Sequence, residues 1–117
     1  MIIRSSEREV SRTVRFNGKG EIAMIPVLPP VPESFFGKGR LFSEARMKPG
    51  EVFGTHAHHG ECELYLIISG EGTYNDNGTP VKVGPGDVCV CNDGESHGME
   101  NTGTEELYYI ALILFTK

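Results

Sequence analysis

The residues with the clearest chemical potential are histidines and glutamates in residues 50–70. His56 and His58 are two residues apart, and the carboxylates of Glu61 and Glu63 follow shortly after them. Histidines at positions i and i+2 of an extended chain point to the same face, with Cα atoms about 6–7 Å apart. Both imidazoles can therefore bind one ion, because metal–nitrogen bonds are about 2.0–2.1 Å long.

A third imidazole, that of His97, lies well beyond this segment and could complete a site with three nitrogens and one oxygen. Such a donor set suits one divalent first-row ion per chain (Mn, Fe, Co, Ni, Cu or Zn), whereas Mg and Ca prefer oxygen ligands. Glu61 and Glu63 share a strand face if the strand has already begun at Glu61, so both remain candidates. His59 follows His58 directly and should point to the opposite face, into solvent.

Composition limits the protein's class and partners. A chain of 117 residues forms one domain with a single core. The net charge of −5 gives no electrostatic reason to bind nucleic acid or anionic lipid, so we expect neither as a partner. There is no signal-peptide pattern, no apolar run of membrane-spanning length and an odd number of cysteines, three. We therefore expect a cytoplasmic protein whose cysteines are small core residues.

Turn residues at short intervals predict an all-β sandwich or barrel. A first hairpin is expected over residues 10–27, with its turn at Asn17–Gly20, and a proline-rich surface loop over residues 26–39. A strand over residues 41–48 should place Leu41, Ser43, Ala45 and Met47 on one face. The strands expected after it cover residues 63–69, 73–75, 80–83, 87–91, 97–101 and 107–115.

Two of these strands, over residues 88–91 and 107–115, are apolar on both faces. A small barrel buries only one face of each strand, so the other face needs a cover. The first hairpin and loop could supply it, or a second copy of the chain could. We expect a homodimer.

The spacing of these residues resembles the two sequence motifs of a small single-domain cupin. The first motif is filled at every fixed position, by Gly50, His56, His58, Glu63 and Gly70. The second is filled by Gly86, Gly94, His97 and Asn101. Asn92 stands where the family has proline, and because asparagine also forms turns we expect a changed loop and an intact site.

The resemblance implies a double-stranded β-helix, that is, a jelly-roll cupin barrel, with an N-terminal hairpin. Residues 1–40 would form the hairpin and the proline-rich loop that pack on a barrel made by residues 41–117. It also implies one metal ion bound by four side chains, and the family spacing selects Glu63 over Glu61. The proposed ligands are His56, His58, Glu63 and His97.

Strand parity suggests which residues surround the metal. Tyr65 and Ile67 share the face of Glu63, and Met99 shares that of His97, so all three are expected to line the cavity, with plain core packing as the alternative. The phenol of Tyr65 could orient a substrate or hold a proton, which makes it a candidate catalytic residue.

Three further residues have two possible roles. Asn101 has the parity of the cavity residues but could only shape the following turn. Arg46 or Arg40 could neutralise an anionic substrate near the metal, or either could be a solvated surface charge.

These features support three function hypotheses, each with a small molecule as the partner. The first is a metalloenzyme, oxygenase-like or an isomerase/lyase, in which the ion binds substrate or dioxygen. The second is a non-catalytic cupin that binds or senses a sugar or metabolite. The third is a metal-stabilised structural or storage protein. The barrel hosts many chemistries, so the fold alone does not select among them.

Overall fold

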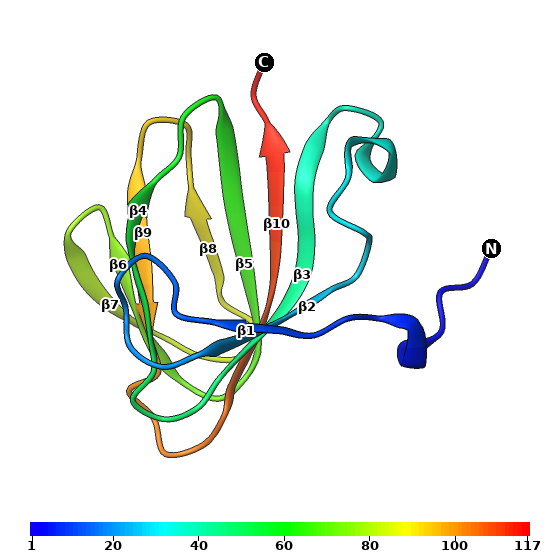
Figure 1. Ribbon diagram of the computed structural model, residues 1–117. Coiled ribbons are helices and arrows are strands. Elements are labelled where there is room, and N and C mark those ends of the chain that lie inside the picture. Colours follow the sequence, from blue (N-terminus) through cyan, green and yellow to red (C-terminus); the bar gives the residue numbers. More distant parts are fainter.

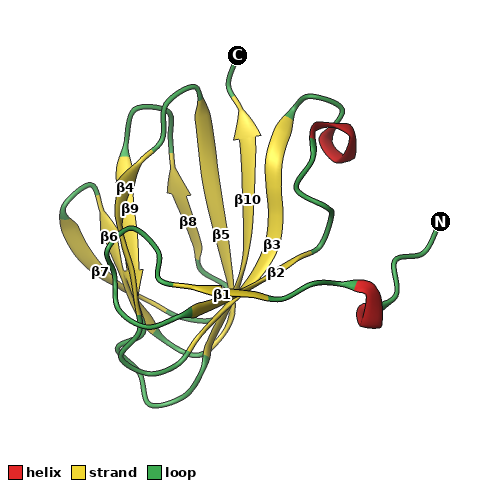
Figure 2. Ribbon diagram, in the orientation of Figure 1, coloured by secondary structure: helices red, strands yellow, loops and turns green.

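The computed structural model describes residues 1–117, and Figure 2 shows strands joined by loops, with two short 3-10 turns as the only helical elements. The strands are β1 (Ser11–Thr13), β2 (Ile22–Pro26), β3 (Gly39–Met47), β4 (Val52–Ala57), β5 (Glu61–Ser69), β6 (Gly72–Asp76), β7 (Thr79–Val83), β8 (Val88–Cys91), β9 (Ser96–Glu100) and β10 (Leu107–Phe115). The 3-10 turns are η1 (Ser5–Glu7) and η2 (Pro32–Phe35).

Two antiparallel sheets face each other and enclose the core (Figure 1). The larger has the order β1-β2-β3-β10-β5-β8 and the smaller β4-β9-β6-β7. This arrangement confirms the expected all-β jelly roll. The turn residues behave as their types predict: between β6 and β7, Asn77 and Gly78 both have positive φ, at 52° and 94°. Two such residues in succession are typical of the tight hairpin turn that Asn-Gly favours.

The core follows from strand alternation. In β3, Ser43, Ala45 and Met47 are buried as expected, while Leu41 is only partly buried. The closing strand β10 lies between β3 and β5 and faces the interior with every second residue. Its buried residues are Leu107, Tyr109, Ala111 and Ile113.

The N-terminal hairpin is part of the larger sheet. Ser11 of β1 pairs with Met24 of β2, and Ala23 of β2 pairs with Arg46 of β3. The expected strand through Phe16 is wrong in its extent, because β1 ends at Thr13.

The chain between β1 and β2 instead crosses to the smaller sheet, where it lies beside β4. Lys19 and Val52 exchange two backbone hydrogen bonds of 2.9 and 2.8 Å. Phe16 and Asn17 adopt left-handed conformations, with φ of 51° and 55°, which turn the chain out of the β1 direction. We call residues 14–20 the crossing loop.

The proline-rich segment, expected to be a plain surface loop, contains the turn η2 and contributes to the core. Phe35, the last residue of η2, is buried. Phe36 follows in the left-handed conformation, with φ of 53°, and is exposed.

The outer face of β5 and β8 is apolar and exposed. Leu66 and Val88 are direct cross-strand partners and are 42% and 58% exposed. Ile68 and Val90 on the same strands are both 43% exposed. Because the hairpin continues the opposite edge of the sheet, it does not cover this face. The homodimer stays a prediction.

Two findings bear on the expected compartment. The chain has no helix with the length and apolar character needed to span a membrane. All three cysteines are free thiols; Cys89 and Cys91 are buried core residues as expected, whereas Cys62 is only partly buried. The cytoplasmic location stays a prediction.

Candidate metal centre

Four side chains, three from strands and one from the connection after β4, meet between the two sheets. His56 lies near the end of β4 and pairs with His97 of β9, while His58 follows β4 and Glu63 belongs to β5. Their side chains are only 1–7% exposed. One donor atom from each lies within 4.8 Å of all the others. The structure thus brings together the four residues that the spacing selected.

Most of the printed separations between donor atoms lie near 3 Å. Nε2 of His97 lies 3.1 Å from Nε2 of both His56 and His58. Oε1 of Glu63 lies 2.9 Å from His97 Nε2 and 3.1 Å from His58 Nε2, but 3.7 Å from His56 Nε2. Bonds of about 2.0–2.2 Å meeting at right angles on one ion put ligand atoms about 2.8–3.1 Å apart. The cluster therefore has the dimensions of a metal-ligand set.

Hydrogen bonds to the outer ring nitrogens fix how two of the imidazoles are protonated. Nδ1 of His56 donates to the carbonyl of Gly54 at 2.8 Å, and Nδ1 of His58 donates to Oε2 of Glu61 at 2.5 Å. A carbonyl and a carboxylate only accept, so in the neutral rings the proton is on Nδ1. Each Nε2 then presents a lone pair to the centre of the cluster.

His97 is held by two tyrosines. Its Nδ1 and the hydroxyl of Tyr74 are 2.8 Å apart, and the ring of Tyr65 stacks on it at 5.0 Å with an interplanar angle of 20°. Burial lowers the pKa of His97 and so favours the neutral, metal-binding form.

The charge state of the cluster favours a cation. Burial alone would raise the pKa of Glu63, but its close contacts with the imidazoles of His56, His58 and His97 outweigh burial and lower that pKa below its usual range. The carboxylate is therefore ionised. The imidazole nitrogens around it are about as close to one another as the ligand atoms of a single ion. Lone pairs at this separation repel unless a proton or a metal ion lies between them. This group could hold a metal ion.

The structure separates the roles of the two candidate carboxylates. β5 begins at Glu61, so Glu61 and Glu63 do share a strand face, but only Glu63 reaches the centre of the cluster. Glu61 accepts from His58 on one side and from Nε and Nη2 of Arg40, both at 2.7 Å, on the other. Hydrogen bonds from Arg40 first, and then from His58, lower the pKa of Glu61. Glu61 thus orients a ligand as a carboxylate.

A cavity of about 150 Å³ adjoins the cluster and has apolar walls with two guanidinium groups. Arg15 and Phe16 come from the crossing loop, and Arg40 from β3. The ring of Phe16 stacks on His56 at 4.0 Å with an interplanar angle of 9°. Neither crossing-loop residue is predicted from the sequence, because nothing in the local pattern of a hairpin indicates that its loop reaches a distant strand.

The expected cavity residues lie at different depths. Tyr65 lines the cavity; its hydroxyl lies near Glu63 but has no partner with hydrogen-bond geometry. Burial raises the pKa of Tyr65, so its phenol keeps its proton. Ile67 and Met99 are buried in the core and do not line this cavity. A residue four positions along a strand is about 13 Å away, which places Ile67 far below Glu63.

The remaining candidates have structural or surface roles. The side-chain amide of Asn101 donates to the carbonyls of Met47 and Glu105, both at 2.8 Å, and so shapes the turn before β10. Arg46 pairs with Glu106 on the outer face, away from the cluster. His59 is exposed, as expected.

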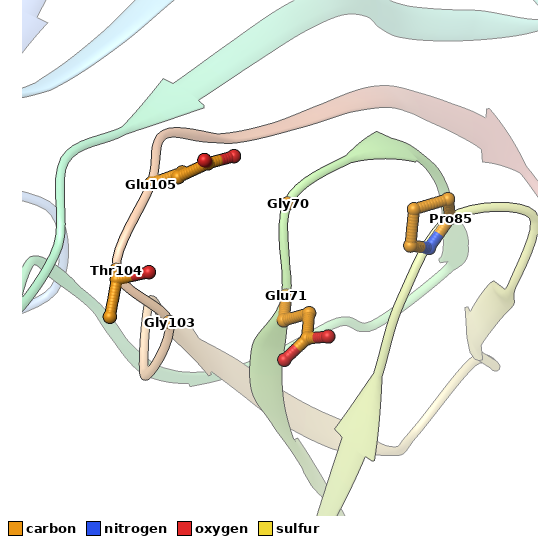
Figure 3. Close-up of a pocket in the computed structure, with 6 residues that line it drawn as sticks. All are labelled: Gly70, Glu71, Pro85, Gly103, Thr104 and Glu105. Carbon is orange, nitrogen blue, oxygen red and sulfur yellow. The ribbon is translucent and has the colours of Figure 1, made fainter.

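A second hollow, of about 300 Å³, is open to solvent between the β5–β6, β7–β8 and β9–β10 connections (Figure 3). Its lining includes the carboxylates of Glu71 and Glu105 but no histidine, cysteine or basic residue. The chemistry is therefore concentrated at the histidine cluster.

Comparison with known proteins agrees with this geometry. The family model for the cupin domain matches residues 43–113, more than half of the chain. The chain belongs to the cupin family. The matched segment includes all four residues of the cluster, whereas Arg15 and Phe16 precede it.

Individual relatives place this cupin more closely. It is 43% identical over 115 residues to an oxalate-binding protein from Thermotoga maritima, covering 97% of this chain and 93% of the relative. The crystal structure of a predicted oxalate decarboxylase from Thermotoga maritima superposes with a TM-score of 0.91 at 42% identity, covering 98% and 99% of the two chains. KdgF from Halomonas sp., with a TM-score of 0.74 at 16% identity over 100% of this chain and 96% of its own, shares the fold.

Proposed function

We propose that this cupin binds one divalent transition-metal ion through His56, His58, Glu63 and His97, and through that ion a small dicarboxylate of the oxalate type. The observation that carries the proposal is the convergence of the three Nε2 atoms and one carboxylate oxygen within 4.8 Å, with outer hydrogen bonds fixing the tautomers of His56 and His58. The 43% identity to an oxalate-binding protein supports the choice of ligand.

The cavity beside the cluster suits a small anion. Two arginines line it, Arg15 and the Glu61-paired Arg40, and its volume of about 150 Å³ admits only a compact molecule. A divalent ion held by four protein ligands would supply Lewis-acid binding of carboxylate oxygens at its remaining coordination positions. Phe16 and Phe53 form part of the cavity's apolar wall, and a low local dielectric strengthens charge–charge contacts.

The test is calorimetric titration of oxalate into Mn²⁺-loaded protein, metal-free protein and the His58→Ala variant. Oxalate should bind the loaded protein in a 1:1 ratio and should not bind the other two, because chelation needs the ion and the ion needs His58. Equal oxalate binding with and without Mn²⁺ would contradict the proposal. Formate and a neutral sugar titrated in parallel test the two-carboxylate requirement and the sugar-binding alternative.

The oxygenase-like and isomerase/lyase reactions stay predictions. Apart from the proposed ligands, the titratable groups in the cavity wall are two arginines and two tyrosines, which suit holding an anion more than transferring protons at neutral pH. Consumption of oxalate by the Mn²⁺-loaded protein in air would support a catalytic role. Stable binding without turnover would support the binding alternative.

A further inference from the structure

Two buried side-chain atoms in the molecule have no hydrogen-bond partner: Nε of Arg15 and the hydroxyl oxygen of Tyr65. Both residues line the cavity beside the histidine cluster. Buried polar groups in folded proteins are nearly always paired, so an unpaired donor in a cavity marks a place where a ligand or an ordered water binds. The residues that line this one small cavity therefore carry two unpaired hydrogen-bonding atoms.

The position of Arg15 is set by the crossing loop. Its outer nitrogen Nη2 donates to Ser11 at 3.0 Å, while the inner edge that carries Nε faces the buried side. Its backbone carbonyl accepts from the amides of Gly18 and Gly54, at 2.9 and 3.0 Å. Arg15 is thus held at its backbone and at one guanidinium nitrogen before any ligand binds, which favours pre-organised recognition.

The other donor is equally fixed. Tyr65 is 1% exposed, and its ring is packed against His97 at 5.0 Å and Tyr109 at 4.6 Å. A phenol so confined cannot turn to solvent to find a partner. The N–H of Arg15 donates only, and the hydroxyl of Tyr65 can donate, so the complementary group is an acceptor with two lone-pair sites, such as a carboxylate.

We propose that Arg15 and Tyr65 form a carboxylate-recognition subsite that binds the oxygens of the dicarboxylate directed away from the metal. This inference rests on the proposed function and deepens it by naming the residues that distinguish a dicarboxylate from a monocarboxylate. Arg15 lies outside the segment matched by the cupin family model and Tyr65 lies within it, so the N-terminal hairpin supplies one residue of the subsite and the cupin barrel supplies the other.

Calorimetry on Mn²⁺-loaded Arg15→Gln and Tyr65→Phe variants tests the subsite. Arg15→Gln should weaken oxalate binding by about tenfold or more, because a charge-assisted hydrogen bond is lost, and should leave formate binding and Mn²⁺ affinity unchanged. Tyr65→Phe should weaken oxalate binding by a smaller factor. The double variant should lose less than the product of the two factors, because both residues hold the same group.

Arg12→Gln is the matched control, since Arg12 lies on the same hairpin but is exposed on β1. It should bind oxalate as the wild type does. If the wild-type protein binds oxalate and Arg15→Gln binds it with the same affinity, the subsite alone is overturned. Failure of the wild-type protein to bind oxalate while it holds Mn²⁺ would overturn the proposed function together with the subsite.

Discussion

His58 donates its Nδ1 proton to Glu61, at 2.5 Å, and so directs the lone pair of its Nε2 toward the other donor atoms of the cluster. Arg40 holds the same carboxylate with two hydrogen bonds of 2.7 Å. The three residues form a chain from the cavity wall to the proposed metal. Such outer contacts fix the tautomer and the orientation of a ligating histidine.

Glu61→Gln should therefore weaken metal binding without unfolding the protein. The amide can still contact Nδ1 but carries no charge to raise the basicity of the ring, and loss of such a partner typically costs about 10–100-fold in metal affinity. Competition with a chromogenic chelator measures the change. Glu105→Gln, at an exposed position, should have wild-type affinity. Equal metal affinity in the two variants would show that Glu61 does not orient a ligand.

The carboxylate of Glu44 should make stability depend on acid pH. Hydrogen bonds from Tyr108 first, and then from Arg8, lower the pKa of Glu44 from its ordinary value of 4.5. A lowered folded-state pKa stabilises the protein above the ordinary value, and this contribution is lost as pH falls through the folded-state pKa. Glu44→Gln should cost about 1 kcal/mol at neutral pH and progressively less in acid.

Urea unfolding of Glu44→Gln and the wild type across this pH range measures the difference, with Glu105→Gln again as the exposed control. A difference in the free energy of unfolding between Glu44→Gln and the wild type that stays constant from neutral to strongly acid pH would exclude this role.

The exposed apolar face of β5 and β8 should be an interface between two copies of the chain. Val88, with its cross-strand partner Leu66, is at the edge of the larger sheet, where a charge would disrupt association. Val88→Lys should convert a dimer to a monomer in sedimentation velocity at micromolar concentration. Val81→Lys, on the other sheet and 44% exposed, should stay dimeric. A wild-type protein that sediments as a monomer would remove the dimer.

Gly54 should control the crossing loop and, through it, ligand binding. A Cβ at Gly54 would lie 1.9 Å from the carbonyl oxygen of Phe16, so Gly54→Ala must push the loop away. We expect faster amide exchange at Lys19, whose N–H bonds to Val52, and weaker oxalate binding. Gly84→Ala is the control, because its Cβ would meet nothing within 4 Å. Unchanged Lys19 exchange in Gly54→Ala would contradict this coupling.

The sequence was most informative where a local rule decides geometry. Period-two alternation placed Ser43, Ala45 and Met47 in the core, and the same rule put His56 and His58 on one face. Alternation gives direction but not depth along the strand, which is why Ile67 was expected in a cavity that it does not line. It could not separate Glu61 from Glu63 either, because both share a strand face.

The parts that could not be predicted depend on contacts between distant segments. The crossing loop reaches β4 because Lys19 pairs with Val52 and because the glycines at 18 and 54 let two backbones approach closely. Neither the pairing nor the close approach leaves a local signal in residues 10–27. The sequence therefore does not distinguish Arg15 from the other charged residues of the hairpin, although Arg15 lines the cavity beside the histidine cluster.

Metal content is the most direct test of the central claim. Purified wild type, His97→Ala and His59→Ala would be loaded with Mn²⁺, freed of unbound ion and measured by elemental analysis. We predict about one ion per chain in the wild type and in His59→Ala, whose imidazole is exposed, and almost none in His97→Ala. A wild-type protein without bound metal, or full occupancy in His97→Ala, would contradict a site built from these side chains.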